Sequence, residues 1–200
     1  MLSKDELASL LLNDIDEFNK EIDGSPIDLS EMDFSGINIE GAIFDNVDLT
    51  SSSFADANLT EVKFLGCDLT SVDFNRANLV ECVFNESVLN GADFSYSKAD
   101  YCNFADADLA GAIMRDADFS NSDFSAAENL NASRFDDSTI WPDNEYLPED
   151  FDTSYSDDLS SLKDDDDYEI SDNLMNVLTE FGFLVAAAVI CIFVKQRHGT

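Results

Sequence analysis

Residues 44–64 read FDNVDLTSSSFADANLTEVKF, with an apolar centre at every fifth position. The spacing continues in both directions through twenty consecutive centres, which are Leu29, Phe34, Ile39, Phe44, Leu49, Phe54, Leu59, Phe64, Leu69, Phe74, Leu79, Phe84, Leu89, Phe94, Ala99, Phe104, Leu109, Met114, Phe119 and Phe124. Two positions before the centre stands a small or modest residue, such as Ala57 or Cys67, and the other positions are mostly polar. A period of five fits neither a helix, at about 3.6 residues per turn, nor a flat strand, at about two. The pattern therefore predicts a chain that turns a corner after each pentapeptide.

Several pentapeptides carry a family resemblance. Residues 57–61 (ANLTE), 77–79 (ANL) and 107–111 (ADLAG) resemble the A(D/N)LXX signature of pentapeptide-repeat proteins, and the resemblance covers roughly residues 27–140. It implies an all-β solenoid, a right-handed quadrilateral β-helix in which four pentapeptides make one square coil. Five coils would follow from the twenty centres, each rising by about 4.8 Å, the spacing of paired strands.

Residues twenty apart should then stack in four columns of the interior. The columns are Leu29, Leu49, Leu69, Leu89, Leu109; Phe34, Phe54, Phe74, Phe94, Met114; Ile39, Leu59, Leu79, Ala99, Phe119; and Phe44, Phe64, Phe84, Phe104, Phe124. Aliphatic faces therefore alternate with Phe faces, as expected if the interior fills in layers. The alternative is a low-complexity acidic chain that only looks periodic.

Both ends of a solenoid need a cover, because an open coil exposes apolar surface and a free sheet edge. Residues 1–24 predict an amphipathic cap helix, with a capping-box pattern at Ser3 and Glu6. Its apolar residues at helical spacing are Leu7, Leu11, Ile15, Phe18 and Ile22. The rival, a helix lying on a membrane surface, fits less well because the polar face is acidic.

The repeat phase slips by one residue after Phe124, and the next centres are Leu130, Phe135 and Ile140. We interpret the slip as a bulge or loop near residues 126–129. A last, irregular coil should end at Trp141 and Pro142, where the indole can cover the core and the proline cannot extend the ladder. The solenoid is therefore expected to span residues 25–141.

Beyond the repeats, the sequence changes character twice. Residues 142–173 carry thirteen acidic residues and one lysine, which is typical of an extended, self-repelling, disordered linker. Residues 174–194 contain only three polar residues and, at about 1.5 Å per residue, match the hydrocarbon thickness of a bilayer. They predict a single-pass transmembrane helix, and a soluble helix is the alternative. Gly182 and Ala186 form a small-xxx-small pair that would allow a homodimer of such helices.

Two arguments about topology conflict. The short basic tail, residues 195–200, favours a cytoplasmic tail and a repeat domain on the periplasmic or luminal side. The first 22 residues, however, lack the basic and apolar stretches of a secretory signal. We therefore expect a C-terminal membrane anchor with the repeat domain in the cytoplasm.

The composition limits the partners and the kinds of site that we expect in this protein. The net charge of -33 repels nucleic acid and attracts basic surfaces, so we expect a basic protein partner and no direct binding to nucleic acid. The only histidine is His198, so we expect no catalytic site, no metal site and no cofactor. Cys67, Cys82 and Cys102 occupy the small inward position and fit as core filler. The last two are twenty residues apart, which also raises the hypothesis of a disulfide.

Acidic residues gather on two adjoining faces of the expected solenoid. We call the set that stands immediately before the centres the acidic strip, and it comprises Asp28, Asp48, Asp68, Asp108, Asp33, Asp73 and Asp93. It predicts either a solvated surface or a docking strip for a cationic protein. The favoured function is a non-enzymatic, membrane-anchored scaffold or protein-interaction module. The alternative, implied by the family resemblance, is a DNA mimic that binds a topoisomerase or another basic nucleic-acid-binding protein.

Overall fold

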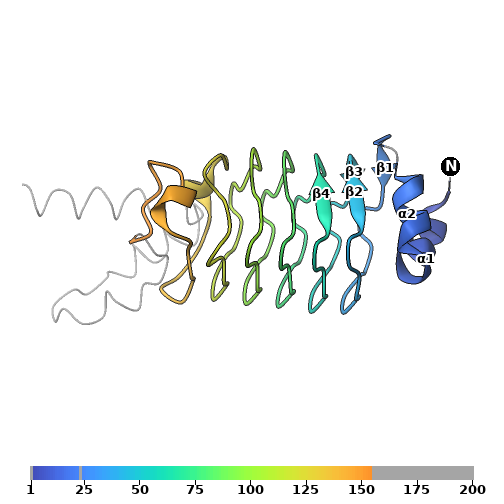
Figure 1. The fold of residues 1–200 in the computed structure, drawn as a ribbon, viewed down its shortest axis with the longest axis horizontal. Helices are drawn as coiled ribbons and strands as arrows, with labels where there is room; N and C mark the ends of the chain where they lie inside the picture. The colour runs from blue at the N-terminus through green and yellow to red at the C-terminus, as the bar shows by residue number, and fades with distance from the viewer. Residues whose placement is uncertain (1, 23, 155–200) are drawn as a thin grey trace, which may run out of the picture. The chain divides into compact units, whose positions relative to one another are not determined.

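The computed structural model describes residues 2–22 and 24–154. The chain divides into two compact units, Met1–Asp158 and Leu159–Thr200, and the second lies outside the described residues. The elements of the first unit, in chain order, are α1 (Lys4–Asn13), α2 (Ile15–Glu21), β1 (Ile27–Asp28), β2 (Ile43–Asp45), β3 (Val47–Asp48), β4 (Lys63–Leu65), η1 (Leu130–Ala132) and η2 (Asn144–Tyr146). The coils follow the two helices in chain order (Figure 1).

Parallel pairing between residues twenty apart builds the solenoid. Strand β1 pairs with β3 through Ile27 and Val47, and β2 pairs with β4 through Phe44 and Phe64. Parallel bridges at the same register continue up to the pair Asp108 and Glu128. The predicted β-helical solenoid and the twenty-residue repeat of its coils are thereby confirmed.

Most corners are tight turns that close by a backbone hydrogen bond from the inward residue to the preceding centre. The Ala57 N–H donates to the Phe54 carbonyl at 3.1 Å, for example, and Asp56 between them has a positive φ of 57°. The same left-handed corner recurs every five residues from Glu31 to Asp116. Only glycine adopts this conformation without steric cost, so the non-glycine corners need the packed core to hold them.

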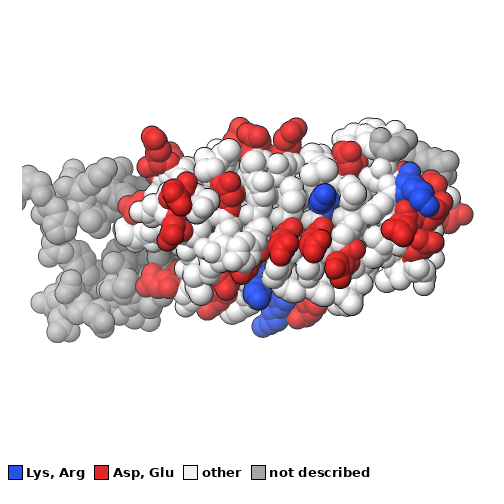
Figure 2. Space-filling model, in the orientation of Figure 1, with Lys and Arg blue, Asp and Glu red and all other residues white. Residues whose placement is uncertain are grey.

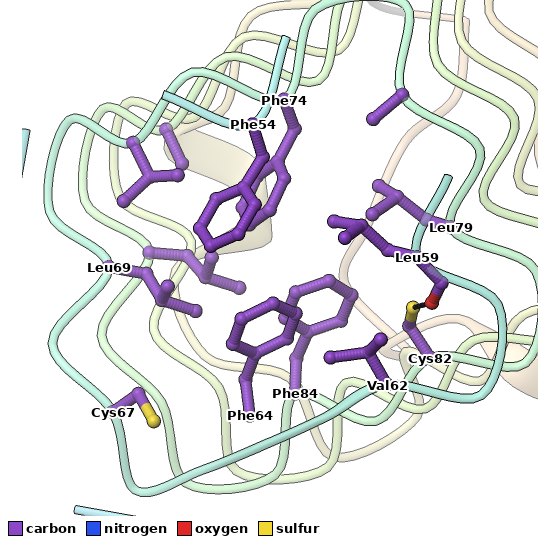
Figure 3. Packing of buried hydrophobic residues seen from close by; sticks show 14 of the residues in the cluster. Phe54, Leu59, Val62, Phe64, Cys67, Leu69, Phe74, Leu79, Cys82 and Phe84 are labelled. Carbon is purple, nitrogen blue, oxygen red and sulfur yellow. Dashed lines mark hydrogen bonds between the residues drawn. The ribbon is translucent and has the colours of Figure 1, made fainter. Parts of the chain in front are cut away.

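The core consists of the four predicted columns. All twenty centres are buried, the most accessible being Phe34 at 5%. Phe44, Phe64 and Phe84 stack nearly parallel, with ring centroids 5.0 and 5.3 Å apart, and Figure 3 shows two such columns facing each other. Stacks one coil apart and edge-to-face contacts between columns are the favoured geometries of aromatic pairs. The ring spacing thus matches the strand spacing that fixes the coil rise.

Buried serines at the inward position do more than fill space. The Cys67 N–H donates to the Ser87 hydroxyl at 3.1 Å, and that hydroxyl donates to the Phe64 carbonyl at 3.0 Å. The hydroxyl therefore bridges the two groups that bond directly at other corners. Ser52 makes the same bridge between Met32 and Leu29.

The N-terminal cap is helical as predicted, but it consists of two helices instead of one. Asp14 separates them, because its side chain accepts from the Glu17 N–H at 3.0 Å and begins α2. The capping box of Ser3 and Glu6 is present, and Leu7, Leu11, Phe18 and Ile22 are buried while Ile15 is partly buried. The turn at Asp14 lets both short helices lay apolar residues on the first coil.

Two polar side chains of the cap cover the open edge of the first coil. The Asn19 amide donates to the Gly41 carbonyl at 3.1 Å and accepts from the Ile43 N–H at 2.8 Å. Lys4 Nζ donates to the Ser30 carbonyl at 3.1 Å. The Ile43 N–H and the Ser30 carbonyl would otherwise be unpaired, because the coil that bonds the equivalent groups later in the chain is missing here.

The other end differs from the expectation in one centre. Leu130 and Phe135 are buried as predicted, whereas Ile140 is 51% exposed. The Phe119 N–H bonds to the Ile140 carbonyl, which shifts the inward position to Trp141. A second inserted residue within the last coil explains the shift, since the bridge of Asp118 to Ile140 spans twenty-two residues.

Packing continues beyond Trp141, where we expected the solenoid to end. The Phe124 N–H bonds to the Tyr146 carbonyl, and Leu147 is buried. Phe151 packs against Trp141 with ring centroids 4.8 Å apart. Residues 143–151, which the sequence places in the acidic linker, therefore complete and cover the last coil.

The predicted membrane span, residues 174–194, lies outside the described residues, as does the linker from residue 155 onward. Within the described part of the chain, no helix combines the length and the apolar character that a bilayer crossing needs.

Candidate interaction surface

The aspartates before the centres have a structural role in the turns. The Asp48 carboxylate accepts from the Thr50 N–H at 2.9 Å, and Asp68 accepts from the Thr70 N–H at 3.0 Å. All seven residues of the acidic strip make this bond through Oδ1. Asn103 makes the same bond to the Ala105 N–H, so the turn requires an acceptor and not a charge.

Coil pairing brings the acidic strip together in two columns. The first column runs Asp28, Asp48, Asp68, Val88, Asp108, and the second runs Asp33, Ser53, Asp73, Asp93, Ile113. Three carboxylates are thus consecutive in the first column, and two are consecutive in the second. Asp108 is separated from the others by Val88 and does not extend the run.

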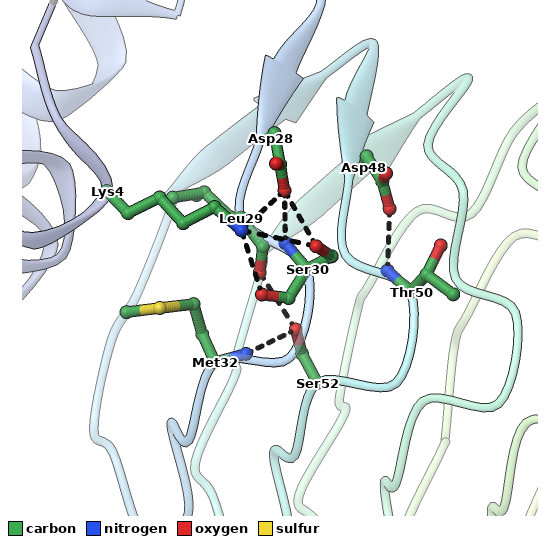
Figure 4. Close-up of polar contacts among 8 residues, drawn as sticks. All are labelled: Lys4, Asp28, Leu29, Ser30, Met32, Asp48, Thr50 and Ser52. Atoms are coloured by element: carbon green, nitrogen blue, oxygen red, sulfur yellow. Dashed lines mark hydrogen bonds and ion pairs between the residues drawn. The ribbon is translucent and has the colours of Figure 1, made fainter.

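The first member of the strip is already paired. Lys4 Nζ lies 2.6 Å from Asp28 Oδ1, and the hydroxyl and N–H of Ser30 donate to the same carboxylate, as Figure 4 shows. The Lys4 ammonium, together with these two bonds from Ser30, lowers the pKa of Asp28 to about 2. Asp28 therefore holds the cap in place. Asp48 and Asp68 are then the carboxylates at this end of the first column that remain available to a partner.

A shallow groove follows the first column. It has a volume of about 340 Å³, and its walls include Asp48, Asp68, Asn46 and Gly66. The apolar residue Val47 also lines it. A groove with carboxylates on one wall and apolar surface beside them fits the aliphatic stem and charged head of a basic side chain.

Like charges one coil apart repel, and the repulsion is weakened by salt or by a basic partner. Figure 2 shows acidic side chains along the visible face of the coils, with few basic ones among them. Lys63 and Lys98 occupy the same outward position on the other two faces of the coils. At the position before the centres, carboxylates are therefore most frequent on the faces of the acidic strip.

A ladder of amides marks the face opposite the first acidic column. Asn58 Nδ2 donates to Asn38 Oδ1 at 2.7 Å, and Asn78 Nδ2 donates to Asn58 Oδ1 at 2.7 Å. The next residue in this column is Lys98, which supplies no amide, and Asn78 Oδ1 is buried without a partner. This column is uncharged over three coils and contrasts with the acidic strip.

The three cysteines of the repeats are free thiols, so the hypothesised disulfide between Cys82 and Cys102 is absent. Cys82 Sγ donates to the Leu59 carbonyl at 2.9 Å, and Cys102 Sγ donates to the Leu79 carbonyl at 3.0 Å. Burial raises the pKa of Cys67 and of Cys102 to about 12 and raises that of Cys82 as well. Thiols held neutral in this way are poor nucleophiles.

Within residues 2–22 and 24–154, no group of three or more His, Cys, Asp or Glu side chains is arranged to hold a metal ion.

The periodicity does not single out two exposed tyrosines. Tyr96 and Tyr101 stand on successive corners, and the Arg76 guanidinium lies 5.1 Å from the centroid of the Tyr96 ring. Their positive φ could have been inferred from their place two residues after a centre. A bulky aromatic residue at such a corner is the signal that sequence reasoning missed.

Residues 26–94 match the family described as pentapeptide repeat region, and residues 102–141 match the one described as pentapeptide repeats (8 copies). No curated protein sequence matches the chain.

Among solved structures, the pentapeptide repeat protein Rfr23 from the cyanobacterium Cyanothece 51142 is similar with a TM-score of 0.57 and 17% identity, over 70% of this chain and 99% of that one. HetL, a pentapeptide repeat protein involved in heterocyst differentiation regulation in Nostoc sp. strain PCC 7120, matches at a TM-score of 0.34 and 19% identity, over 55% of this chain and 56% of that one. QnrB1, a plasmid-mediated fluoroquinolone resistance protein, matches at 0.28 and 17%, over 62% of this chain and 84% of that one.

The likeness to Rfr23 supports the fold alone, because the identity is low. The two family matches together cover more than half of the sequence, and the coil geometry agrees with them. The chain therefore belongs to the pentapeptide-repeat family.

Proposed function

We propose that this chain is a non-enzymatic protein-interaction module that presents an acidic solenoid face to a basic protein partner. A membrane anchor at residues 174–194 completes the proposal and makes the module a membrane-anchored scaffold. The repeat domain faces the cytoplasm in this proposal, with the periplasmic or luminal side as the alternative.

One observation carries the proposal: Asp48 and Asp68 are stacked along a groove although the turn needs only an uncharged acceptor. The fold would accept Asn at both positions, as it does at Asn103. The charge therefore adds repulsion without helping the turn, and a basic partner would relieve that repulsion. The buried neutral thiols and the position of the only histidine, His198, support a role without catalysis.

The test compares two double variants in a pull-down from a detergent extract of the source cells. Asp48→Asn with Asp68→Asn removes two charges beside the groove and keeps both turn acceptors. Asp118→Asn with Asp123→Asn removes two charges with the same turn role on the other faces. We expect the wild type and the second variant to recover a basic protein that the first variant loses. Equal recovery by all three proteins would refute the proposal for this face.

The anchor is tested separately by fractionation. The full chain should stay with membranes after an alkaline wash, and a chain that ends at residue 173 should be released. Protease added to sealed vesicles whose cytoplasmic side faces outward then distinguishes the two sides, since a cytoplasmic repeat domain is digested and a luminal or periplasmic one is protected. A full chain released by the wash would exclude the anchor.

The alternative, mimicry of DNA toward a topoisomerase, gains no specific support. Val88, Ser53 and Ile113 interrupt the carboxylate columns, so the regular charge spacing of a nucleic acid backbone is not reproduced. The likeness to QnrB1, at a TM-score of 0.28, carries no argument.

A further inference from the structure

A second cavity lies between the N-terminal cap and the first coil, and we call it the cap pocket. Its volume is about 490 Å³. Apolar cavities of about 150 Å³ already hold a benzene molecule, so the cap pocket has room for one large apolar side chain. Its lining comes from α1 and the residues before it, from the end of α2 and from the chain through β1, and comprises Leu2, Lys4, Leu7, Glu21, Ser25, Ile27 and Asp28.

The cap pocket exists because helices cover the first coil where a strand covers each later one. Strand β1 pairs with β3, and no other strand within residues 2–22 and 24–154 pairs with it. A helix is about 10 Å across and cannot follow a strand edge as closely as a paired strand, which lies about 4.8 Å away. Space therefore remains beside β1, although Asn19 and Lys4 bond the edge elsewhere on this coil.

The inner wall of the cap pocket is apolar, and its charges leave a negative excess. Leu7 and Ile27 are only 4% and 7% exposed. The Lys4 ammonium is already bound by the Asp28 carboxylate at 2.6 Å, as Figure 4 shows, so these two charges offset each other. The remaining charge in the lining is the exposed carboxylate of Glu21. An apolar side chain from a basic segment therefore suits the pocket in both respects.

The cap pocket is continuous with the groove along the acidic strip, because Ile27 and Asp28 line both cavities. From Asp28 the groove passes Asp48 and Asp68, which lie one and two coils further along the column at about 4.8 Å per coil. An extended peptide advances about 3.3 Å per residue. A residue seated in the cap pocket is therefore separated by about three residues or fewer from side chains that reach Asp48 and Asp68.

We propose that the cap pocket receives an apolar side chain of the basic partner, from a segment in which that residue is close in sequence to lysine or arginine. The inference rests on the proposed function and adds a recognition feature that carboxylates alone do not provide. Negative charge attracts every basic surface. Burial of an apolar side chain beside that charge selects the partners that carry both features together.

The test compares two fluorescent peptides, one of leucine, glycine and four lysines, and one with serine in place of the leucine. Binding to the full chain is measured by anisotropy at low ionic strength in zwitterionic lipid nanodiscs, or in buffer if fractionation finds no anchor, since detergent competes for apolar sites. Empty nanodiscs are the blank. We expect the leucine peptide to bind about tenfold more tightly. Equal affinities would refute the cap pocket and leave the acidic module standing, whereas a wild type that binds neither peptide would overturn both.

A pocket-filling variant locates the effect. Ser25→Phe adds a ring to the lining of the cap pocket, and Ser125→Phe is the matched control, at an exposed serine of the same repeat position five coils later. Ser25→Phe should abolish the advantage of leucine over serine, and Ser125→Phe should keep it. Asp48→Asn with Asp68→Asn should weaken both peptides by the same factor. A leucine advantage that persists in a folded Ser25→Phe protein contradicts the proposal.

A measurement on the wild type makes the result independent of how Ser25→Phe folds. The leucine is replaced by a photoreactive leucine, and the crosslinked residues are identified by mass spectrometry. We expect crosslinks at Leu2, Leu7 or Ile27, and crosslinks confined to other residues would refute the site. A leucine advantage seen only in a chain that ends at residue 173 would assign the pocket to the chain's own later residues. One that disappears as the protein self-associates would assign it to a second copy, and either result overturns the partner.

Discussion

An aspartate and an asparagine before a repeat centre make the same turn bond, but only the aspartate adds charge. Asp48 bonds the Thr50 N–H and Asn103 bonds the Ala105 N–H at nearly equal distances of 2.9 and 2.8 Å. The turn explains why an acceptor recurs at this position, and it leaves the choice of a carboxylate unexplained. That choice is the residue-level reason to look for a partner of opposite charge.

Two buried serines at equivalent inward positions should respond differently to the loss of the hydroxyl. Ser87 bridges the Cys67 N–H and the Phe64 carbonyl, whereas the buried hydroxyl of Ser97 has no partner. We expect Ser87→Ala to lower the free energy of unfolding by about 1–3 kcal/mol because two backbone groups lose their bond. Ser97→Ala should change it by less than about 0.5 kcal/mol or stabilise the protein. Equal effects in urea unfolding would argue against the bridging role.

The ion pair at Asp28 makes a pH-dependent contribution to stability. Lys4 and Ser30 lower the pKa of Asp28 to about 2, below the unfolded value of about 3.9. A lowered carboxyl pKa stabilises the folded state above the unfolded pKa, and the contribution is lost as the pH falls toward 2.

Asp28→Asn keeps the turn acceptor and removes the charge. The difference in Tm between wild type and Asp28→Asn should therefore be constant above about pH 5 and shrink between about pH 4 and pH 2. A difference that stays the same down to pH 2 would show that the pair contributes nothing through charge.

At the scale of elements, the ends of the solenoid depend on contacts that the repeat itself does not contain. The first coil is covered by α1 and α2, and the last coil is completed by Leu147 and Phe151. Both covers combine apolar packing with bonds to edge groups, which is what an isolated coil lacks.

The side chain of Asn19 should carry much of the attachment of the cap. It replaces a missing strand by bonding the Gly41 carbonyl and the Ile43 N–H. We expect Asn19→Ala to cost about 1–3 kcal/mol in unfolding free energy and to speed hydrogen exchange at the Ile43 amide. Lys20→Ala, next to it but exposed, is the control and should cost less than about 0.5 kcal/mol. Unchanged exchange at Ile43 would contradict the edge-capping role.

The amide ladder can be lengthened by one step. Lys98 follows Asn78 in the column, and Asn78 Oδ1 is buried without a partner. Lys98→Asn should supply the missing donor and raise the unfolding free energy by about 1 kcal/mol. Lys98→Ala removes the lysine without adding an amide and should give no such gain. If both variants have the same Tm, the ladder does not contribute.

Periodicity predicted the interior because every repeat meets the same neighbours, and all twenty centres are buried. The same regularity placed the acidic columns correctly. Features that depend on a single event were missed: the break between the helices at Asp14, the inserted residue that makes Trp141 the centre, and the pairing of Asp28 with Lys4. None of these recurs along the chain, so no repeat pattern could indicate them.

At the scale of the whole molecule, a net charge of -33 acts on a fold that has few basic residues to offset it. Stacked carboxylates repel at close range, and the solenoid accepts the cost because its core is continuous from coil to coil. In the proposed function, folding and recruitment of a basic partner are therefore linked through the same charges.

Added salt should stabilise the protein by screening this repulsion. We expect the Tm to rise as sodium chloride increases through the range in which the Debye length falls below about 10 Å. Asp48→Asn with Asp68→Asn should flatten the rise, because two adjacent charges are gone. A Tm independent of salt, measured by calorimetry, would show that the columns are not mutually repelling.

The twenty-residue register has a consequence for how such a chain can change in length. Adding or removing one complete square of the winding shifts every later residue along the axis and leaves it on the same side. Losing a single pentapeptide instead moves every later side chain round by a quarter, so that Asp68 and Asp108 would no longer follow Asp48. The solenoid can therefore be lengthened by whole turns of twenty residues. A partner that recognises one side of it restricts changes in length to multiples of the same number.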